Sequence, residues 1–273
     1  MNPVSENRID RKFRDLKARG QKAFVAYITA GDPSPERTPE LVWALERAGA
    51  DVVELGVPFS DPLADGVVNQ LSAQRALEAG MTPVRILDLL KEIRTKSQIP
   101  IVLYMYFNLI YAYGIERFCQ HVHEAGADGL LVLDLPPEES EGATAVGERL
   151  GDGSLSRISL VAPTSPAERV AKIVQKASGF VYYVSREGVT GMQSSVAGSI
   201  ASRIDLIRKH TTLPVCIGFG ISTPEQAREV ASQGDGAIVG SVLVNRIAEW
   251  GKDADLPQKL EAFARPLAEA IHS

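Results

Sequence analysis

The sequence predicts an α/β fold, a (β/α)8 TIM barrel with an extra N-terminal helix, formed by residues 1–273 as a single domain. Short apolar runs alternate with longer amphipathic patterns along the chain, which is typical of βα repetition and a parallel sheet. Eight such runs are present, and α/β barrels commonly reach 273 residues as one domain. An open doubly wound sheet is the alternative. The lack of a G-x-G-x-x-G segment after the first run counts against it.

The elements follow in chain order. Within residues 9–17, Ile9, Phe13 and Leu16 recur at helical spacing among charged residues, so we expect a helix that covers the bottom of the barrel with its apolar face. The eight predicted strands are residues 23–28, 52–56, 101–106, 129–133, 159–163, 180–185, 214–218 and 236–240.

The ends of the predicted helices are marked by capping residues. A hydroxyl residue directly before a proline predicts a helix N-cap, and this pair occurs at Ser34, Thr82, Ser165 and Thr223. A glycine between a helical pattern and the next strand predicts a left-handed C-cap, and this occurs at Gly49, Gly126 and Gly234.

Composition excludes several classes of protein. A net charge of -5 provides no basic face for a phosphate backbone, so we expect no nucleic-acid partner. Cys119 and Cys216 lack metal-binding spacing, and His121 and His123 would point about 200° apart on a helix. We therefore expect no metal site. The charged first 19 residues contain no apolar signal segment, and no stretch is long enough to span a membrane, so we expect a cytoplasmic protein.

The segment 53–66 carries the clearest sign of chemistry. Glu54 interrupts an apolar strand, where burial of a carboxylate costs free energy unless it is paired, hydrogen-bonded or protonated. The stretch 48–58 is repeated at 125–136, and Glu54 falls where the repeat has Leu131. A solvent-facing residue or a structural ion pair is the alternative interpretation. The break in the scaffold pattern favours a functional acid.

Glycines follow the last three predicted strands, in residues 185–195, 218–223 and 240–241. Glycine lets backbone N–H groups approach an anion, and a helix N-terminus adds a favourable dipole, although barrel turns also need glycine for steric reasons. No Lys or Arg lies within 218–222 or 236–241, and no P-loop lysine motif is present. We therefore expect a phosphate held by backbone and hydroxyl donors, with the candidates Gly191, Gly220, Gly240 and Ser241.

The chain resembles tryptophan synthase alpha subunits over nearly its whole length, in the stretches 24–33, 54–66, 104–108, 182–191, 218–222 and 239–241. The resemblance implies a lyase that cleaves indole-3-glycerol phosphate to indole and D-glyceraldehyde 3-phosphate by a retro-aldol reaction in L-tryptophan biosynthesis. It implies an α2β2 complex with a beta subunit that receives the indole and carries pyridoxal phosphate. No cofactor is expected in this chain.

The resemblance also implies roles for single residues. Glu54 would move protons at the indole C3 and at the side-chain hydroxyl, Asp65 would bind the indole N–H, and Asp61 would lie at the subunit interface. Thr190 would bond Asp65 when its loop closes. Relatives often carry Phe in place of Tyr27 and an aliphatic residue in place of Tyr104, so the indole pocket is expected to be more polar here. The expected substrate-binding residues are Tyr27, Tyr104, Tyr106, Tyr182, Thr190 and Phe219.

Three other functions compete with this interpretation. A Schiff-base aldolase needs a lysine, and the eight predicted strands contain none. A stand-alone lyase that forms indole would keep both Glu54 and Asp65. A catalytically silent activator subunit would be favoured by the loss of either acid, and both are present. Activity measured with and without a beta subunit separates these functions.

Overall fold

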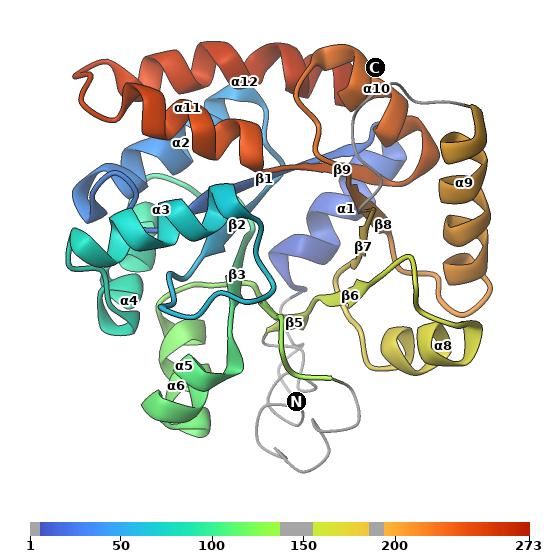
Figure 1. Ribbon diagram of the computed structural model, residues 1–273, viewed down its shortest axis with the longest axis horizontal. Coiled ribbons are helices and arrows are strands. Elements are labelled where there is room, and N and C mark those ends of the chain that lie inside the picture. Colours follow the sequence, from blue (N-terminus) through green and yellow to red (C-terminus); the bar gives the residue numbers. More distant parts are fainter. Residues whose placement is uncertain (1–5, 137–154, 186–193) are drawn as a thin grey trace.

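Parallel strands form the centre of the molecule (Figure 1). The computed structural model describes residues 6–136, 155–185 and 194–273. In these residues the sheet has the order β5-β4-β3-β2-β1-β9-β8-β7-β6. Its two ends, β5 and β6, are consecutive in the chain, so the sheet closes as a barrel and the predicted fold class is confirmed. The strands are β1 (Ala23–Thr29), β2 (Val52–Gly56), β3 (Ile101–Met105), β4 (Gly129–Val132), β5 (Ser156–Arg157), β6 (Ser159–Val161), β7 (Val181–Val184), β8 (Val215–Gly218) and β9 (Gly236–Val239).

The fifth predicted strand, 159–163, is wrong in its extent. The chain pairs with β4 through β5 and then changes partner, so that β6 pairs with β7. The change occurs at Ile158, whose backbone N–H donates to Leu130 O at 2.9 Å. The strand ends at Val161 because Pro163 has no N–H to continue the ladder. Two short strands therefore replace one.

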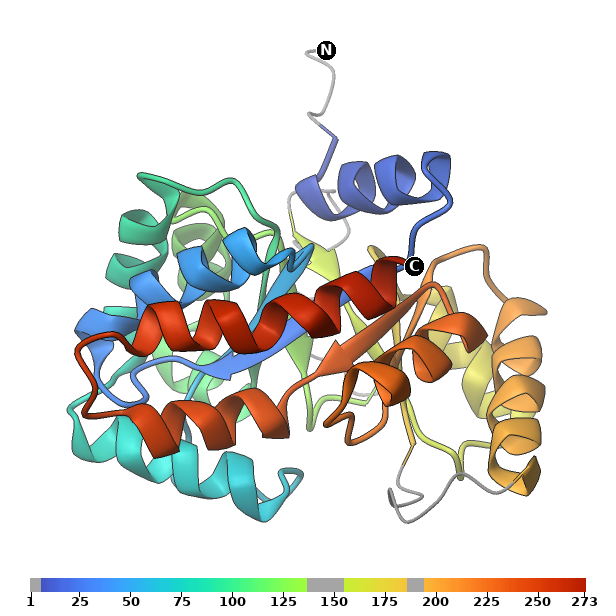
Figure 2. The ribbon, with the colours of Figure 1, turned by 90° about the horizontal axis from the view of Figure 1, so that it is seen from above.

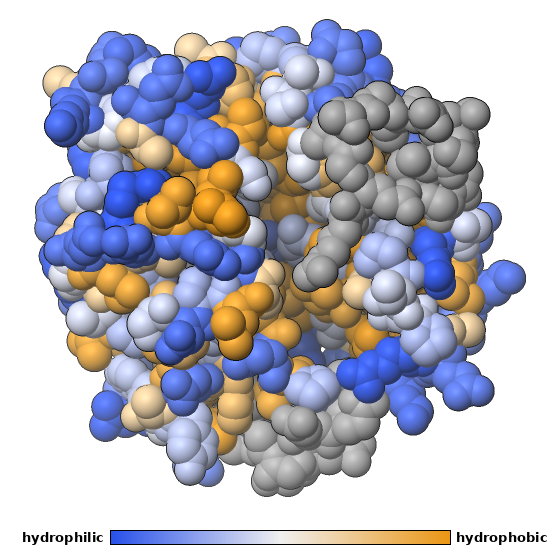
Figure 3. All heavy atoms as spheres, in the orientation of Figure 1, coloured by the Kyte–Doolittle hydropathy of each residue, from blue (hydrophilic) through white to orange (hydrophobic). Residues whose placement is uncertain are grey.

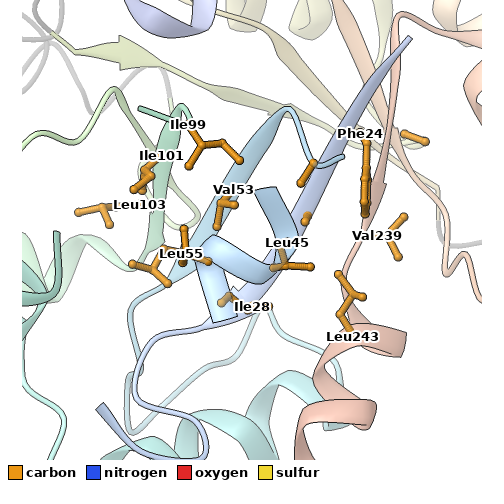
Figure 4. Close-up of a cluster of buried hydrophobic side chains, with 14 of the residues drawn as sticks. Phe24, Ile28, Leu45, Val53, Leu55, Ile99, Ile101, Leu103, Val239 and Leu243 are labelled. Carbon is orange, nitrogen blue, oxygen red and sulfur yellow. The ribbon is translucent and has the colours of Figure 1, made fainter. Parts of the chain in front are cut away.

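Helices cover the outside of the barrel, and a large apolar cluster lies between the two layers (Figures 1 and 4). Figure 4 shows side chains of β1, β2 and β3 packing with Leu45 and Leu243 from the surrounding helices. The helices are α1 (Arg8–Ala18), the 3-10 helix η1 (Pro35–Arg37), α2 (Thr38–Ala48), α3 (Val67–Glu78), α4 (Pro83–Arg94), α5 (Phe107–Tyr113), α6 (Ile115–Glu124), α8 (Ala167–Gln175), α9 (Ser194–Arg208), α10 (Pro224–Gln233), α11 (Ser241–Trp250) and α12 (Leu256–His272).

Helix α1 lies apart from the others, across the N-terminal end of the barrel (Figure 2). Its buried residues Ile9, Phe13 and Leu16 belong to a second apolar cluster inside the barrel. The ring of Phe13 lies 5.5 Å from the ring of Phe180, measured between centroids. The predicted role of this helix in closing the barrel bottom is confirmed. We call this second group the interior cluster, and its buried residues are Ile9, Phe13, Leu16, Ala23, Val25, Val52, Val102, Leu131, Ile158, Phe180, Cys216 and Ile238.

Two of the four predicted N-caps are confirmed. The Thr82 and Thr223 side chains accept hydrogen bonds from backbone N–H groups of α4 and α10. Ser34 precedes only the short helix η1 and makes no capping bond. The N-cap at Ser165 is wrong, because α8 begins at Ala167 and the Ser165 N–H closes a turn to Ala162 O instead.

Two of the three predicted C-cap glycines are confirmed. Gly49 and Gly126 have φ values of 107° and 97°. Gly234 is wrong as a left-handed cap, because its φ is −126° and its ψ is −157°. A Cβ at Gly234 would lie 2.7 Å from Val215 O, so glycine is needed there for the close approach of β8.

The described part of the chain can also be searched for disulfides, membrane-spanning helices and metal sites. Cys119 and Cys216 are buried, and they are not joined by a disulfide. No described helix is long and apolar enough to cross a membrane. The described residues also contain no group of three side chains that could hold a metal, and the His121 ring nitrogen Nδ1 lies 2.9 Å from the Tyr113 hydroxyl.

Candidate active site

Glu54 lies inside the barrel, in the middle of β2. Its register partners are Tyr27 on β1 and Val102 on β3. Val52 belongs to the interior cluster, and alternation along the strand places Glu54 on the same inward face. The internal repeat agrees with this placement, because Leu131 is itself a member of the interior cluster. Figure 3 shows the end of the barrel toward which β2 runs, with a hollow at its centre.

The Glu54 carboxyl group is fully buried and has no partner among the described residues. Its exposed fraction is 0%, and neither carboxyl oxygen has a hydrogen bond within the described parts of the chain. Burial raises the pKa of Glu54 to about 8, because the apolar surroundings penalise the charged form. The group is therefore mostly protonated at neutral pH. The alternative interpretations, a solvent-facing residue or a structural ion pair, do not hold for Glu54.

Two phenols lie near Glu54, the buried Tyr27 and the partly buried Tyr182. Desolvation raises the pKa of each, and the Glu54 carboxylate raises both further. Glycines opposite them leave room for the rings. A Cβ at Gly218 would lie 2.8 Å from the Tyr182 hydroxyl, and one at Gly56 would collide with the Tyr27 hydroxyl. The barrel interior near Glu54 thus contains polar groups that stay uncharged.

Asp65 follows β2 on the loop to α3, and it is held by Tyr104 on β3 and by Tyr106, which directly follows that strand. The Tyr104 hydroxyl donates to Oδ1 at 2.9 Å, and the Tyr106 hydroxyl donates to Oδ2 at 2.8 Å. Tyr106 also accepts from the Ala64 N–H at 3.0 Å, which fixes the loop backbone. Asn69 Nδ2 approaches Asp65 Oδ1 at 3.4 Å. Asp65 is therefore a fixed, half-buried carboxylate, whereas Asp61 is exposed.

A short chain of hydroxyl groups links the barrel interior to α3. The Tyr27 and Thr29 hydroxyls lie 3.4 Å apart, the Thr29 and Ser72 hydroxyls lie 2.6 Å apart, and Ser72 donates to Asn69 O at 2.8 Å. Sequence reasoning missed Thr29, Ser72 and Asn69. Spacing alone could have indicated two of them. Thr29 lies two residues after Tyr27 on one strand face, and Asn69 lies four residues after Asp65.

Three of the four predicted phosphate residues, Gly220, Gly240 and Ser241, follow β8 and β9, which are neighbouring strands. Gly220 has a φ of 48°. Gly240 is the N-cap of α11, and Ser241 is the exposed first residue of that helix. A Cβ at Gly240 would lie 3.3 Å from Tyr27 Cβ, so this helix terminus is close to the barrel interior.

Helices α10 and α11 differ at their N-termini. In α10 the Thr223 side chain accepts the Gln226 N–H, and the Gln226 side chain binds back to the Thr223 N–H. In α11 no side chain caps the helix. The first N–H groups of α11 therefore have no side-chain acceptor, and the predicted role of Gly240 and Ser241 in holding a phosphate stays a prediction.

Phe219 is not brought to this group, and two other predicted site residues cannot be placed in it. Phe219 is 4% exposed and belongs to the cluster between barrel and helices. Thr190 and Gly191 lie outside the described residues. Their predicted roles stay predictions.

Comparisons with known proteins agree on one family. A family model described as tryptophan synthase alpha chain matches residues 13–272. The tryptophan synthase alpha chain of Opitutus terrae is 51% identical over 262 residues, which cover 96% of this chain and 97% of that protein. The tryptophan synthase alpha chain of a Geobacter species is 49% identical over 265 residues, 97% of this chain and 98% of that one.

Solved structures give the same result. The tryptophan synthase subunit alpha of Legionella pneumophila superposes with a TM-score of 0.89 at 39% identity, covering 98% of this chain and 99% of that chain. A chain of tryptophan synthase from M. tuberculosis, in an open form, superposes with a TM-score of 0.85 at 29% identity, covering 97% and 98% of the two chains.

Proposed function

The chain belongs to the tryptophan synthase alpha chain family, and we propose that Glu54 and Asp65 divide the acid–base work of its reaction. The activity is that of a lyase, which cleaves indole-3-glycerol phosphate to indole and D-glyceraldehyde 3-phosphate. The alpha chain works with a tryptophan synthase beta subunit, and pyridoxal phosphate is carried by that subunit.

The cleavage needs two proton transfers and one nearby anion. A proton is added to ring carbon C3, which leaves positive charge on the ring nitrogen. A second proton leaves the hydroxyl of the adjacent side-chain carbon as its C–O bond becomes a carbonyl. The C–C bond then breaks, and its electron pair restores the aromatic ring. One acid that gives a proton and takes one back is unchanged at the end.

The observation that carries the proposal is the Glu54 carboxyl group, which is buried and has no hydrogen-bond partner in the part of the chain that the structure describes. Because its pKa is raised to about 8, the group begins as an acid and can give its proton to C3. As the resulting carboxylate it can then accept the proton of the hydroxyl. A pKa near the working pH suits a group that must act in both directions.

Asp65 supplies the anion for the ring nitrogen. Tyr104 and Tyr106 hold both of its oxygens, so the carboxylate is oriented before charge develops in the substrate. A charge that is already in place needs little reorganisation in the transition state. Within the described residues Asp65 forms no ion pair, and its side-chain partners there are the two phenols and the Asn69 amide.

The other predicted residues complete the proposed site. Tyr27 and Tyr182 would contact the indole, together with the rings of Tyr104 and Tyr106, and Thr190 would join them, whereas Phe219 packs between the barrel and the helices. Backbone groups at Gly191, Gly220 and Gly240 and the Ser241 hydroxyl would hold the phosphate. We also propose that the whole chain is one domain, binds no cofactor of its own, and acts in the cytoplasm in an α2β2 complex.

Replacement of Glu54 by Gln tests the proposal. Glu54→Gln keeps the shape of the side chain and removes the titrating group, so we expect a loss of at least ~10²-fold in kcat with little change in KM. Glu78→Gln, at an exposed position on α3, is the matched control and should leave both constants unchanged. Near-normal turnover by Glu54→Gln would remove Glu54 from the mechanism.

Assays with and without the beta subunit test the rest. An alpha chain should cleave its substrate faster when the beta subunit is added. Full activity without the partner would indicate a stand-alone lyase, and no cleavage under either condition would indicate a silent activator.

A further inference from the structure

We propose that Tyr104 is a positioning residue for the cleavage reaction, whose hydroxyl holds the Asp65 carboxylate in its reactive orientation. The inference rests on the role proposed above for Asp65. It gives Tyr104 a function apart from its predicted contact with the indole ring. Its hydroxyl already binds the second acid of the site.

The two tyrosines reach Asp65 because of their spacing on one strand. Tyr104 and Tyr106 are two residues apart and therefore point to the same side of the chain. Each donates to a different carboxylate oxygen. Tyr104 pairs in the sheet with Gly56 on one side and Leu131 on the other, whereas Asp65 lies on a loop. The sheet therefore determines where the Asp65 carboxylate points.

Tyr104 and Tyr106 differ in what else they hold. The Tyr106 hydroxyl also accepts the Ala64 N–H, and its ring lies 5.2 Å from that of Phe59. Removing it would disturb the loop itself. In the described residues the Tyr104 hydroxyl bonds only Asp65, and its ring packs edge-on against Tyr27 at 5.0 Å. Loss of the Tyr104 hydroxyl therefore alters Asp65 without removing a backbone contact.

A phenol suits this position better than a cation. Burial raises the pKa of Tyr104, and the nearby Asp65 charge raises it further, so the phenol stays a neutral donor. A lysine or arginine would also hold Asp65, but its charge would oppose the positive charge that develops on the indole nitrogen. The phenol orients the carboxylate and leaves its net charge intact.

The expected effect is on turnover rather than on substrate binding. The attraction between Asp65 and the ring grows as charge develops on the ring nitrogen. A loosely held Asp65 therefore stabilises the transition state less, while the stability of the bound substrate changes little. With Tyr106 still in place, Tyr104→Phe should lower kcat about tenfold and change KM less than about twofold.

A double-mutant cycle tests whether Tyr104 acts through Asp65. The full-length chain, with saturating beta subunit, is assayed with indole-3-glycerol phosphate as wild type, Tyr104→Phe, Asp65→Asn and the double variant. In the Asp65→Asn background, Tyr104→Phe should cost less than about twofold in kcat, because the partner is already lost. Tyr113→Phe is the matched control, since it also loses a hydrogen-bonded phenol hydroxyl, away from the site, and should keep its kcat.

The outcomes of the cycle distinguish the role of Tyr104 from that of Asp65. An equal loss from Tyr104→Phe in both backgrounds would show that Tyr104 acts on the fold and not on Asp65, and would overturn the inference. A normal kcat in Tyr104→Phe, beside a large loss in Asp65→Asn, would also overturn it while leaving the proposed function standing. An unchanged kcat in Asp65→Asn would refute the proposed role of Asp65 itself.

Discussion

Carboxyl groups toward the two ends of the barrel have opposite surroundings. At the N-terminal end, Asp51, Asp128 and Asp235 each stand directly before a strand and accept a backbone N–H from the first or second residue of a neighbouring strand. Each also contacts basic side chains, which are His272 and Lys12, Arg8 and Arg94, and Arg208 respectively. At the C-terminal end, Glu54 has no partner among the described residues and Asp65 has phenols and an amide.

The paired carboxylates at the N-terminal end serve stability, whereas Glu54 and Asp65 are available for the reaction. A carboxylate that is hydrogen-bonded and paired stays ionised and ties strands together, but its proton is no longer available near neutral pH. A buried carboxyl group without partners costs stability and keeps a proton to exchange. One barrel therefore uses the same functional group for both purposes, and the surroundings decide which.

Removal of Asp128 should have the largest effect on stability. Its oxygens accept from Arg8 at 2.7 Å, from Arg94 at 2.8 Å and from the Ile101 N–H at 2.8 Å. Asp128→Ala leaves the largely buried Arg94 with backbone carbonyl acceptors but without a carboxylate to balance its charge, so we expect a loss of about 3–5 kcal/mol in the free energy of unfolding. Chemical denaturation measures it.

The control for Asp128→Ala is Asp15→Ala, at an exposed position on α1, which should change stability by less than about 0.5 kcal/mol. Turnover per folded molecule should stay normal in both variants. A large loss of kcat in folded Asp128→Ala would mean that the two ends of the barrel are not separate in function.

Replacement of Asp65 should have the next largest effect, on catalysis. Asp65→Asn keeps the side-chain shape and removes the charge opposite the ring nitrogen, so we expect about a 10²-fold loss of kcat. Affinity for glycerol phosphate, measured by calorimetry, should be kept. If that affinity collapsed while bound substrate turned over normally, Asp65 would belong to the phosphate site.

Patterns with a regular period were predictable from the sequence. Apolar runs gave the strands, and helical spacing gave α1 and its contact with the barrel. Glu54 could be found because the repeat places an aliphatic residue, Leu131, at the equivalent position. Gly234 was misread because, like Gly49, it stands between a helical pattern and the next strand, whereas glycine is needed there for the close approach of Val215 O.

Contacts between loops and strands were not predictable in this way. The hydrogen bonds from Tyr104 and Tyr106 to Asp65 join residues 39 and 41 positions apart. Their formation depends on the path of the β2–α3 loop, which no local pattern specifies. The hydroxyl chain through Thr29 and Ser72 joins residues 43 apart and was missed for the same reason.

Glu54 is buried and has no partner among the described residues. Its protonation in the folded state can therefore be measured from how the free energy of unfolding depends on pH. Its pKa is raised from 4.5 to about 8, so between these values the folded state keeps a proton that the unfolded chain has released. The free energy of unfolding must then fall as pH rises through this window. The fall is about 1.4 kcal/mol per pH unit and ends above about pH 8.

The measurement is the free energy of unfolding of wild type and Glu54→Gln from pH 5 to pH 9. Glutamine does not titrate, so groups common to both proteins cancel in the difference. Glu54→Gln should gain on the wild type steadily up to about pH 8, by on the order of 4 kcal/mol, and then run parallel to it. A difference that is the same at every pH would show that Glu54 titrates alike in both states, and would contradict the account.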